Sequence, residues 1–159
     1  MTEARITKIV LHHAAAPRST TVEDIKRWHT EKGWRDIGYH WLITDAPDSP
    51  VGPKMHIGRA HNLDDRWEPW ERGAHAKGYN SHTIGVCLVG NYSVEPPSEA
   101  MLDMLHGWLV ALCLNLSLEP ADIVGHRELE GAATECPGGF VDMNEIRRRV
   151  REAFGRPEV

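Results

Sequence analysis

Residues 5–13 read Arg-Ile-Thr-Lys-Ile-Val-Leu-His-His, and this stretch decides how the chain folds. Aliphatic residues dominate residues 5–11 without a regular alternation with polar ones, which predicts a strand buried on both faces. A strand of that kind belongs in a sheet that helices cover on both sides. It runs into His12 and His13, so we expect imidazoles at the edge of the sheet, where α/β folds carry their sites.

Strands and helices alternate over the rest of the chain. We predict further strands at residues 39–44, 54–57, 83–89 and 123–125. Helices are expected from Thr20 or Thr21 to Gly33, from Ser98 onward, and over residues 142–154. Glu23 is spaced for a capping box with Thr20. Residues 59–72 are polar, have no clear period and predict a long surface loop.

This alternation predicts an α/β fold with a mixed central sheet flanked by about three helices. The 159 residues are expected to form a single domain, residues 1–159, with a core from about residue 6 to residue 154. The formal net charge of -5 excludes a general nucleic-acid binder. No apolar run reaches the roughly 18 residues of a membrane span, and residues 1–5 lack the apolar core of a secretory signal. We therefore expect a monomer that is made in the cytoplasm.

Three side chains of the kind that bind zinc are spread along the chain: His12, His126 and Cys136. Two imidazoles and a thiolate fill three corners of a zinc tetrahedron and leave the fourth for water, which is typical of a catalytic site. The spacing of His126 and Cys136 matches no zinc finger. His12 and His13 point to opposite faces of a strand, so only one of them can face the metal. Each histidine taken alone is equally well explained as a structural residue.

Several motifs occur in a characteristic order. They are Ile9-Val10-Leu11-His12-His13, Gly38-Tyr39-His40, Gly73-Ala74-His75-Ala76-Lys77-Gly78-Tyr79-Asn80, Gly125-His126-Arg127-Glu128 and Thr134-Glu135-Cys136-Pro137-Gly138. In these motifs the chain resembles the type 2 N-acetylmuramoyl-L-alanine amidases, a family that includes short phage lysozymes and animal peptidoglycan recognition proteins. The resemblance extends from about residue 6 to residue 154.

The resemblance implies one zinc ion, bound by His12, His126 and Cys136. It implies hydrolysis of the amide between N-acetylmuramic acid and L-alanine in peptidoglycan, with Tyr39 as the catalytic hydroxyl. Thr134 stands where the phage enzymes have lysine and where catalytically active recognition proteins have threonine. The oxyanion of such a reaction needs donors besides the metal, and the hydroxyls of Tyr39 and Thr134 are the candidates.

The proton donor to the leaving amine stays open between two residues. Tyr39 is the preferred candidate. Glu128 is the other, although Glu128 is better suited to orient a metal ligand. His29 and His40 are expected to be structural histidines that hydrogen-bond within the fold.

The groove for the substrate is expected to involve the central motif and the polar loop. The resemblance implies contacts of His75 and Asn80 with the stem peptide. Lys77 could bind a peptide carboxylate or be merely solvated. Trp67 and Trp70 are expected either to form one wall of the groove, as aromatic residues with a polar edge do, or to pin the loop to the core.

We expect a phage-type endolysin that acts on periplasmic peptidoglycan after release through membrane lesions. The chain shows no signal, no separate wall-binding segment and no disulfide pattern, which favours this role. The alternative is a non-catalytic muropeptide-binding protein. Such proteins typically lack the cysteine ligand, and Cys136 is present. A third possibility is a protein-binding regulator, for which the sequence identifies no surface.

Overall fold

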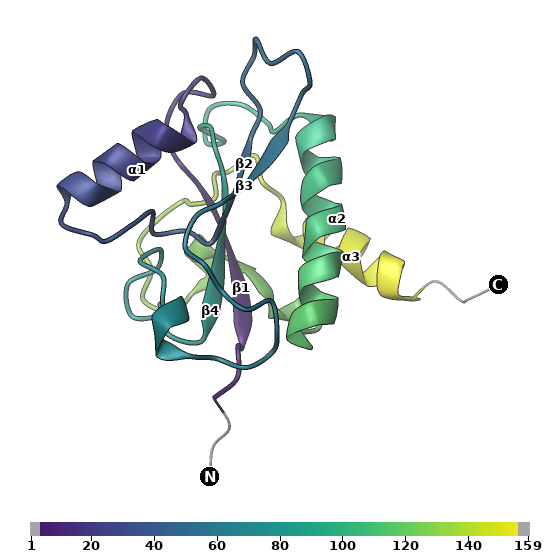
Figure 1. Ribbon diagram of the computed structural model, residues 1–159. Coiled ribbons are helices and arrows are strands. Elements are labelled where there is room, and N and C mark those ends of the chain that lie inside the picture. The colour runs from purple at the N-terminus through teal and green to yellow at the C-terminus, as the bar shows by residue number, and fades with distance from the viewer. Residues whose placement is uncertain (1–3, 156–159) are drawn as a thin grey trace.

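Five strands form one mixed sheet in the order β3-β2-β4-β1-β5 (Figure 1). This computed structural model describes residues 4–155. The strands are β1 (Lys8–His13), β2 (Trp41–Thr44), β3 (Lys54–Ile57), β4 (Thr83–Leu88) and β5 (Ile123–Gly125). β1 runs parallel to β4 and β5, β2 runs parallel to β4, and β3 is the antiparallel edge strand.

Helices cover both faces of this sheet. They are α1 (Val22–Glu31), α2 (Glu99–Leu116) and α3 (Met143–Gly155), with the 3₁₀ helices η1 (Pro69–Glu71), η2 (Pro120–Asp122) and η3 (His126–Glu128). α1 lies on one side of the sheet, and α2 and α3 lie together on the other (Figure 1). The α/β fold with a mixed sheet and three flanking helices is thus confirmed.

The two central strands supply both cores. Ile9 and Leu11 of β1 belong to the large core under α2 and α3, whereas Val10 between them faces the other side. β4 alternates in the same way and places Cys87 beside Ile25 of α1. Side chains that extend from β1 and β4 toward the α1 side therefore share one face of the sheet, and the functional residues are built on that face.

Local boundaries differ from the sequence predictions, most of all at β1, α1 and β2. β1 spans Lys8–His13 instead of residues 5–11 and so includes both histidines. The capping box of α1 joins Thr21 and Asp24, not Thr20 and Glu23, because the Thr21 hydroxyl accepts the Asp24 N–H at 3.0 Å and the Asp24 carboxylate accepts the Thr21 N–H at 3.0 Å. Tyr39 lies before β2 instead of inside it. The backbone of its neighbour Gly38 is held by the His29 ring and by the Ala74 N–H, not by a neighbouring strand.

The loop of residues 59–72 is tied to the core, which decides between the two alternatives for Trp67. Its backbone bonds to the N-terminal segment: the Ile6 N–H donates to the Asp65 carbonyl, and the Trp67 N–H donates to the Ala4 carbonyl. This pairing turns Trp67 inward, where it is 6% exposed in the large core and packs against the ring of His82 at 5.2 Å. Of the two alternatives for Trp67, its burial supports the one in which it pins the loop to the core and not the one in which it lines a groove.

α2 is long and apolar enough to cross a membrane by length and composition. The sequence predicts a helix from Ser98 onward, but the prediction of no membrane span did not take its length and apolar composition into account. One of its sides is buried in the large core, through Met101, Leu105, Leu109 and Leu112. A helix that packs one side on a sheet has the same composition, so the absence of a membrane span stays a prediction.

Candidate active site

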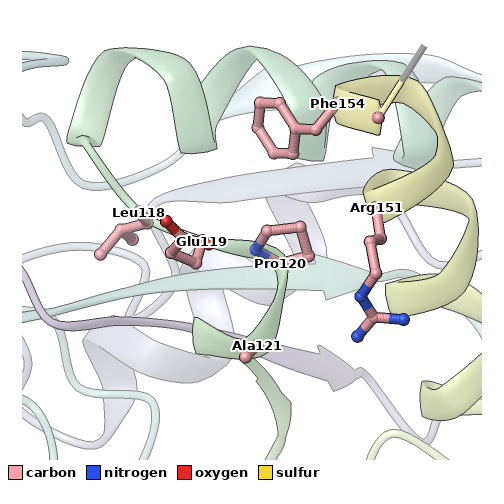
Figure 2. Close-up of a pocket in the computed structure, with 7 residues that line it drawn as sticks. Leu118, Glu119, Pro120, Ala121, Arg151 and Phe154 are labelled. Carbon is pink, nitrogen blue, oxygen red and sulfur yellow. The ribbon is translucent and has the colours of Figure 1, made fainter.

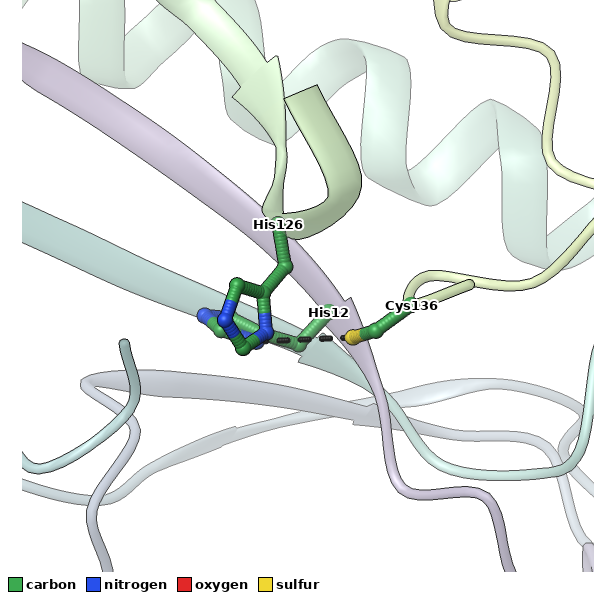
Figure 3. A group of neighbouring side chains, drawn as sticks. All are labelled: His12, His126 and Cys136. Carbon is green, nitrogen blue, oxygen red and sulfur yellow. Dashed lines mark hydrogen bonds between the residues drawn. The ribbon is translucent and has the colours of Figure 1, made fainter. Parts of the chain in front are cut away.

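Three side chains of types that bind metals meet at the edge of the sheet (Figure 3). His12 comes from β1, His126 from the first position of η3, and Cys136 from the loop that precedes α3. Their donor atoms all lie within 4.8 Å of one another. His12 Nδ1 lies 3.5 Å from Cys136 Sγ, and the rings of His12 and His126 are 4.8 Å apart between centroids.

Strand order explains how two of these residues meet. β1 and β5 are parallel neighbours, with Leu11 opposite Gly125. His12 follows Leu11 within β1 and His126 follows Gly125 at the end of β5, so the two histidines lie at the same edge of the sheet. His13 points the other way, as alternation predicts, and its Nδ1 accepts the Tyr92 N–H at 3.0 Å.

Arg127 brings the third residue to this edge. Its backbone N–H donates to the carbonyl of Cys136 at 2.8 Å. Its guanidinium donates to three further carbonyls of the same loop, those of Glu135 at 3.3 Å, Gly138 at 2.7 Å and Val141 at 2.6 Å. Arg127, which follows His126 directly, therefore shapes the loop that carries Cys136.

The donor set suits zinc. A tetrahedral zinc ion with ordinary Zn–S and Zn–N bonds holds a sulfur and a nitrogen about 3.6 Å apart, close to the 3.5 Å between Cys136 Sγ and His12 Nδ1. Burial lowers the pKa of His12 and of His126, which keeps both rings neutral with a lone pair to offer. Burial raises the pKa of Cys136 to about 11, so this thiol must lose a proton when a metal binds. His12, His126 and Cys136 could thus hold a metal ion.

Tyr39 lies against this group. Its ring is half-buried and 5.2 Å from the ring of His12 between centroids. Burial raises the pKa of Tyr39 well above its usual value, and the nearby sulfurs of Cys87 and Cys136 add to the shift. The phenol therefore stays protonated and serves as a hydrogen-bond donor at neutral pH.

Thr134 lies on the exposed side of the same group. Its hydroxyl oxygen accepts the N–H of Cys136 at 3.1 Å, and this leaves the hydroxyl proton free to be donated. Thr134 and His126 line a groove of about 810 Å³. The other lining residues are Lys77, Gly78, Tyr79, Glu130, Gly131, Ala132 and Ala133.

The predicted substrate-binding residues separate in the structure. Lys77 is exposed at the groove. Asn80 accepts the backbone N–H groups of His75 and Ala76 at 2.8 and 2.9 Å, so its side chain orders the loop. Trp70 is 47% exposed, and its indole N–H donates to Glu68 at 2.8 Å.

His75 differs from the expectation of a groove residue that contacts substrate. Its side chain is buried, and its Nδ1 lies 2.9 Å from Nε2 of His12. The sequence carried a signal for this placement that was missed. Gly85 stands inside the buried strand β4, and a glycine there indicates that another group approaches the backbone closely.

Glu128 turns away from the group of ligands. Its carboxylate binds the Arg147 guanidinium at 2.7 and 2.8 Å and accepts the Gly125 N–H at 2.8 Å, and these contacts hold its pKa below the usual value. His29 and His40 hydrogen-bond within the fold: His29 accepts the Gly38 N–H, and His40 accepts the Gly85 N–H at 3.0 Å.

A second hollow of about 470 Å³ lies away from these residues, between the segment 118–121 and α3 (Figure 2). Phe154 and Arg151 of α3 face Leu118 and Pro120 across it. None of its lining residues belongs to the histidine and cysteine group, and it received no role from the sequence.

Comparison with known proteins assigns this architecture to a family. The family model described as N-acetylmuramoyl-L-alanine amidase matches residues 2–139. The chain is similar to an endolysin of Klebsiella phage KP32, with 31% identity over 144 residues that cover 86% of this chain and 83% of the phage protein. The chain belongs to the N-acetylmuramoyl-L-alanine amidase family, which confirms the resemblance found in its motifs.

Two further relatives show the range of the family. Peptidoglycan-recognition protein LB of Drosophila melanogaster is 31% identical over 141 residues, which cover 82% of this chain and 54% of that protein. The chain thus spans about half the length of this relative. Among solved structures, N-acetylmuramoyl-L-alanine amidase LysC from Clostridium intestinale URNW has a TM-score of 0.74 and 25% identity, and the match covers 94% of this chain and 93% of that one.

Proposed function

We propose that the protein is a zinc-dependent N-acetylmuramoyl-L-alanine amidase, which hydrolyses the amide between the lactyl group of N-acetylmuramic acid and L-alanine in peptidoglycan. One observation carries the proposal: His12, His126 and Cys136 converge beside a groove that Thr134 lines. Membership of the amidase family supports the same reaction.

The chain's own groups suit the charge that develops in this reaction. Bound zinc would supply Lewis acidity and a water that is nucleophilic at neutral pH, since zinc lowers the pKa of water from 15.7 to about 7. Addition of water to the lactyl carbonyl places negative charge on the carbonyl oxygen. Tyr39 and Thr134 each hold a hydroxyl proton that is available for donation to this oxygen. The C–N bond then breaks and leaves a lactyl carboxylate and the amine of L-alanine.

The leaving amine needs a proton, and Tyr39 is the proposed donor. Its hydroxyl gives a proton to the nitrogen and takes one from the attacking water, so that the phenol is restored. The alternative donor, Glu128, is committed to Arg147 and to the Gly125 N–H. The raised pKa of Tyr39 fits a group that must not remain ionised between turnovers.

The groove suits a peptide that carries carboxylates. Lys77 is exposed on it, and its ammonium is proposed to bind a carboxylate of the stem peptide. The two sides of the groove are joined by the Tyr79 hydroxyl, which donates to the Glu130 carbonyl at 2.7 Å.

The proposed biological role is bacteriolysis by a monomeric endolysin that acts on periplasmic peptidoglycan after release through membrane lesions. The similarity to a phage endolysin over most of both chains supports this role. The alternative, a muropeptide-binding protein without activity, is suggested by the similarity to a peptidoglycan-recognition protein. The complete set of metal-binding residues favours the enzyme.

The test measures zinc content and release of stem peptides from purified cell wall, for protein as isolated, stripped with chelator, and reloaded with zinc. Cys136→Ser is expected to lose most zinc and nearly all hydrolysis. Cys113→Ser is the matched control, because Cys113 is also buried but lies in α2 and outside the His12, His126 and Cys136 group. Full hydrolysis by metal-free Cys136→Ser would refute the zinc enzyme. Zinc-loaded wild type that sediments with cell wall yet releases no peptide would establish the binding protein instead.

A further inference from the structure

The buried side chain of His75 packs against strand β4 at Gly85, where the strand has no side chain of its own. A Cβ atom at Gly85 would come within 2.6 Å of the His75 ring, so only glycine allows the imidazole to lie against β4. Gly85 is flanked on the same face of β4 by Thr83 and Cys87, and Cys87 is the register partner of His12 in β1. The His75 ring thus spans the space between Thr83 and His12.

The hydrogen bonds along this line have a fixed direction. The Thr83 hydroxyl donates to the Tyr79 carbonyl at 2.5 Å, and a carbonyl oxygen can only accept. With its single proton committed, the Thr83 oxygen must accept at its other contact, 3.1 Å from His75 Nε2. His75 therefore carries its proton on Nε2. In the neutral ring Nδ1 then holds a lone pair, and the partner of that lone pair is His12 Nε2 at 2.9 Å.

We propose that Tyr79, Thr83 and His75 form a buried relay that holds His12 as its Nε2–H tautomer and directs its Nδ1 at the metal position. Each member orients the next, and the final acceptor is a backbone carbonyl that cannot change its role. The free atom at the other end of the His12 ring is Nδ1, which lies 3.5 Å from Cys136 Sγ. His75 and Thr83 are positioning residues in this assignment, since they act through His12.

The relay rests on the proposed zinc site. It predicts the histidine tautomers and the zinc affinity, and both can be measured without an activity assay. Partners that hydrogen-bond to a metal-binding histidine fix its tautomer and orientation, and their loss typically weakens metal binding about 10–100-fold. Thr83→Val keeps the shape of the side chain and removes the acceptor for His75 Nε2–H. Thr83→Ser keeps that acceptor.

The first measurement is ¹⁵N NMR of the histidine rings in metal-free wild type. The relay requires a protonated Nε2 and an unprotonated Nδ1 in both His75 and His12. The opposite tautomer in either ring would overturn it, whatever the variants do.

The second measurement is zinc affinity by competition with a chelator. Thr83→Val should bind zinc about 10-fold more weakly or worse, and Thr83→Ser should bind like wild type. Thr44→Val is the matched control, because Thr44 also contacts a histidine, His56 at 2.9 Å, but on the edge hairpin. Equal affinity of wild type and Thr83→Val refutes the relay and leaves the zinc site standing. Wild type that binds no zinc refutes both. If Thr83→Val does not fold, the tautomers in wild type still decide.

Discussion

Replacing Arg127 by methionine should detach the loop that carries Cys136. The Arg127 guanidinium binds the Gly138 and Val141 carbonyls at 2.7 and 2.6 Å, and Glu135 more weakly at 3.3 Å. Methionine has similar length and no donors, so the variant removes these bonds and keeps most of the packing. The backbone bond from residue 127 to the Cys136 carbonyl does not depend on the side chain and should remain.

The two short hydrogen bonds, to the Gly138 and Val141 carbonyls, determine how much stability Arg127→Met should lose. A hydrogen bond from a charged group is worth about 1.5–3 kcal/mol when its partner is buried. Arg127 is half-buried and water can reach part of the loop, so the lower end applies and the pair is worth about 3 kcal/mol. For a chain of this size each kcal/mol lowers Tm by about 2–4 °C, which gives about 6–12 °C. If the loop opens locally, the same energy appears as zinc affinity weakened by up to about 100-fold.

Thermal unfolding and zinc competition on the same variant separate these two results. Arg127→Lys should lie between wild type and Arg127→Met, because one ammonium cannot reach all three carbonyls in the geometry of a guanidinium. Arg148→Met is the control: Arg148 forms ion pairs with Glu145 and Glu152 on the exposed side of α3, and its loss should leave Tm and zinc affinity unchanged. Arg127→Met with the Tm and zinc affinity of wild type would show that the loop holds itself in place without the guanidinium.

Three other outcomes are expected. Tyr39→Phe should keep zinc and cell-wall binding while turnover falls about 10²–10³-fold, as for the loss of one oxyanion donor; wild-type turnover in this variant would exclude a catalytic role. Trp67→Ala should destabilise the fold by about 3–5 kcal/mol, because the side chain is buried in the large core, whereas Trp70→Ala, exposed on the same loop, should leave Tm nearly unchanged. Equal Tm values for the two tryptophan variants would contradict the assignment of Trp67 to the core. Burial lowers the pKa of His29 to about 4 and that of His40 to about 3. Unfolded histidines, with a pKa near 6.5, take up protons that the folded ones refuse, so the stability present above about pH 6.5 should fall as the pH drops toward 4. Melting curves with chelator between pH 7.5 and 4.5 test this, and a constant Tm over that range would contradict it.

The fold could be predicted because its signals are local. The uninterrupted apolar runs of β1 and β4 are typical of strands covered on both faces, and each helix begins with a capping side chain within one residue of the predicted position. The inward turn of Trp67 could not be predicted in this way. It follows from pairing between residues 65–67 and residues 4–6, which are about sixty positions apart, and the polar composition of the loop gives no sign of it.

The candidate site, like the fold, could be predicted from the sequence only in part. The sequence identified His12, His126 and Cys136 as ligand types at strand ends, and parallel pairing of β1 with β5 then determines that the two histidines meet. The surroundings of these ligands could not be read from their own motifs. The motifs give Arg127 no role of its own and place His75 at the groove, because only the folded chain shows which carbonyls lie next to Arg127 and which strand lies next to His75.

Two of the candidate ligands are held in different ways, His12 within a central strand and Cys136 on a loop. His12 belongs to a central strand, and its ring is held from behind through His75. Cys136 belongs to the loop between η3 and α3. Its position depends on the Arg127 side chain, on the Arg127 N–H that donates to its carbonyl, and on the contact of its sulfur with the His13 N–H at 3.4 Å. The thiol of Cys136 must lose its proton before it can bind a metal, so metal binding and ordering of this loop stabilise each other. Thr134 lies on the same loop, with its hydroxyl bonded to the Cys136 N–H. Ordering of Cys136 on metal binding would therefore also fix the position of Thr134, the proposed oxyanion donor at the groove.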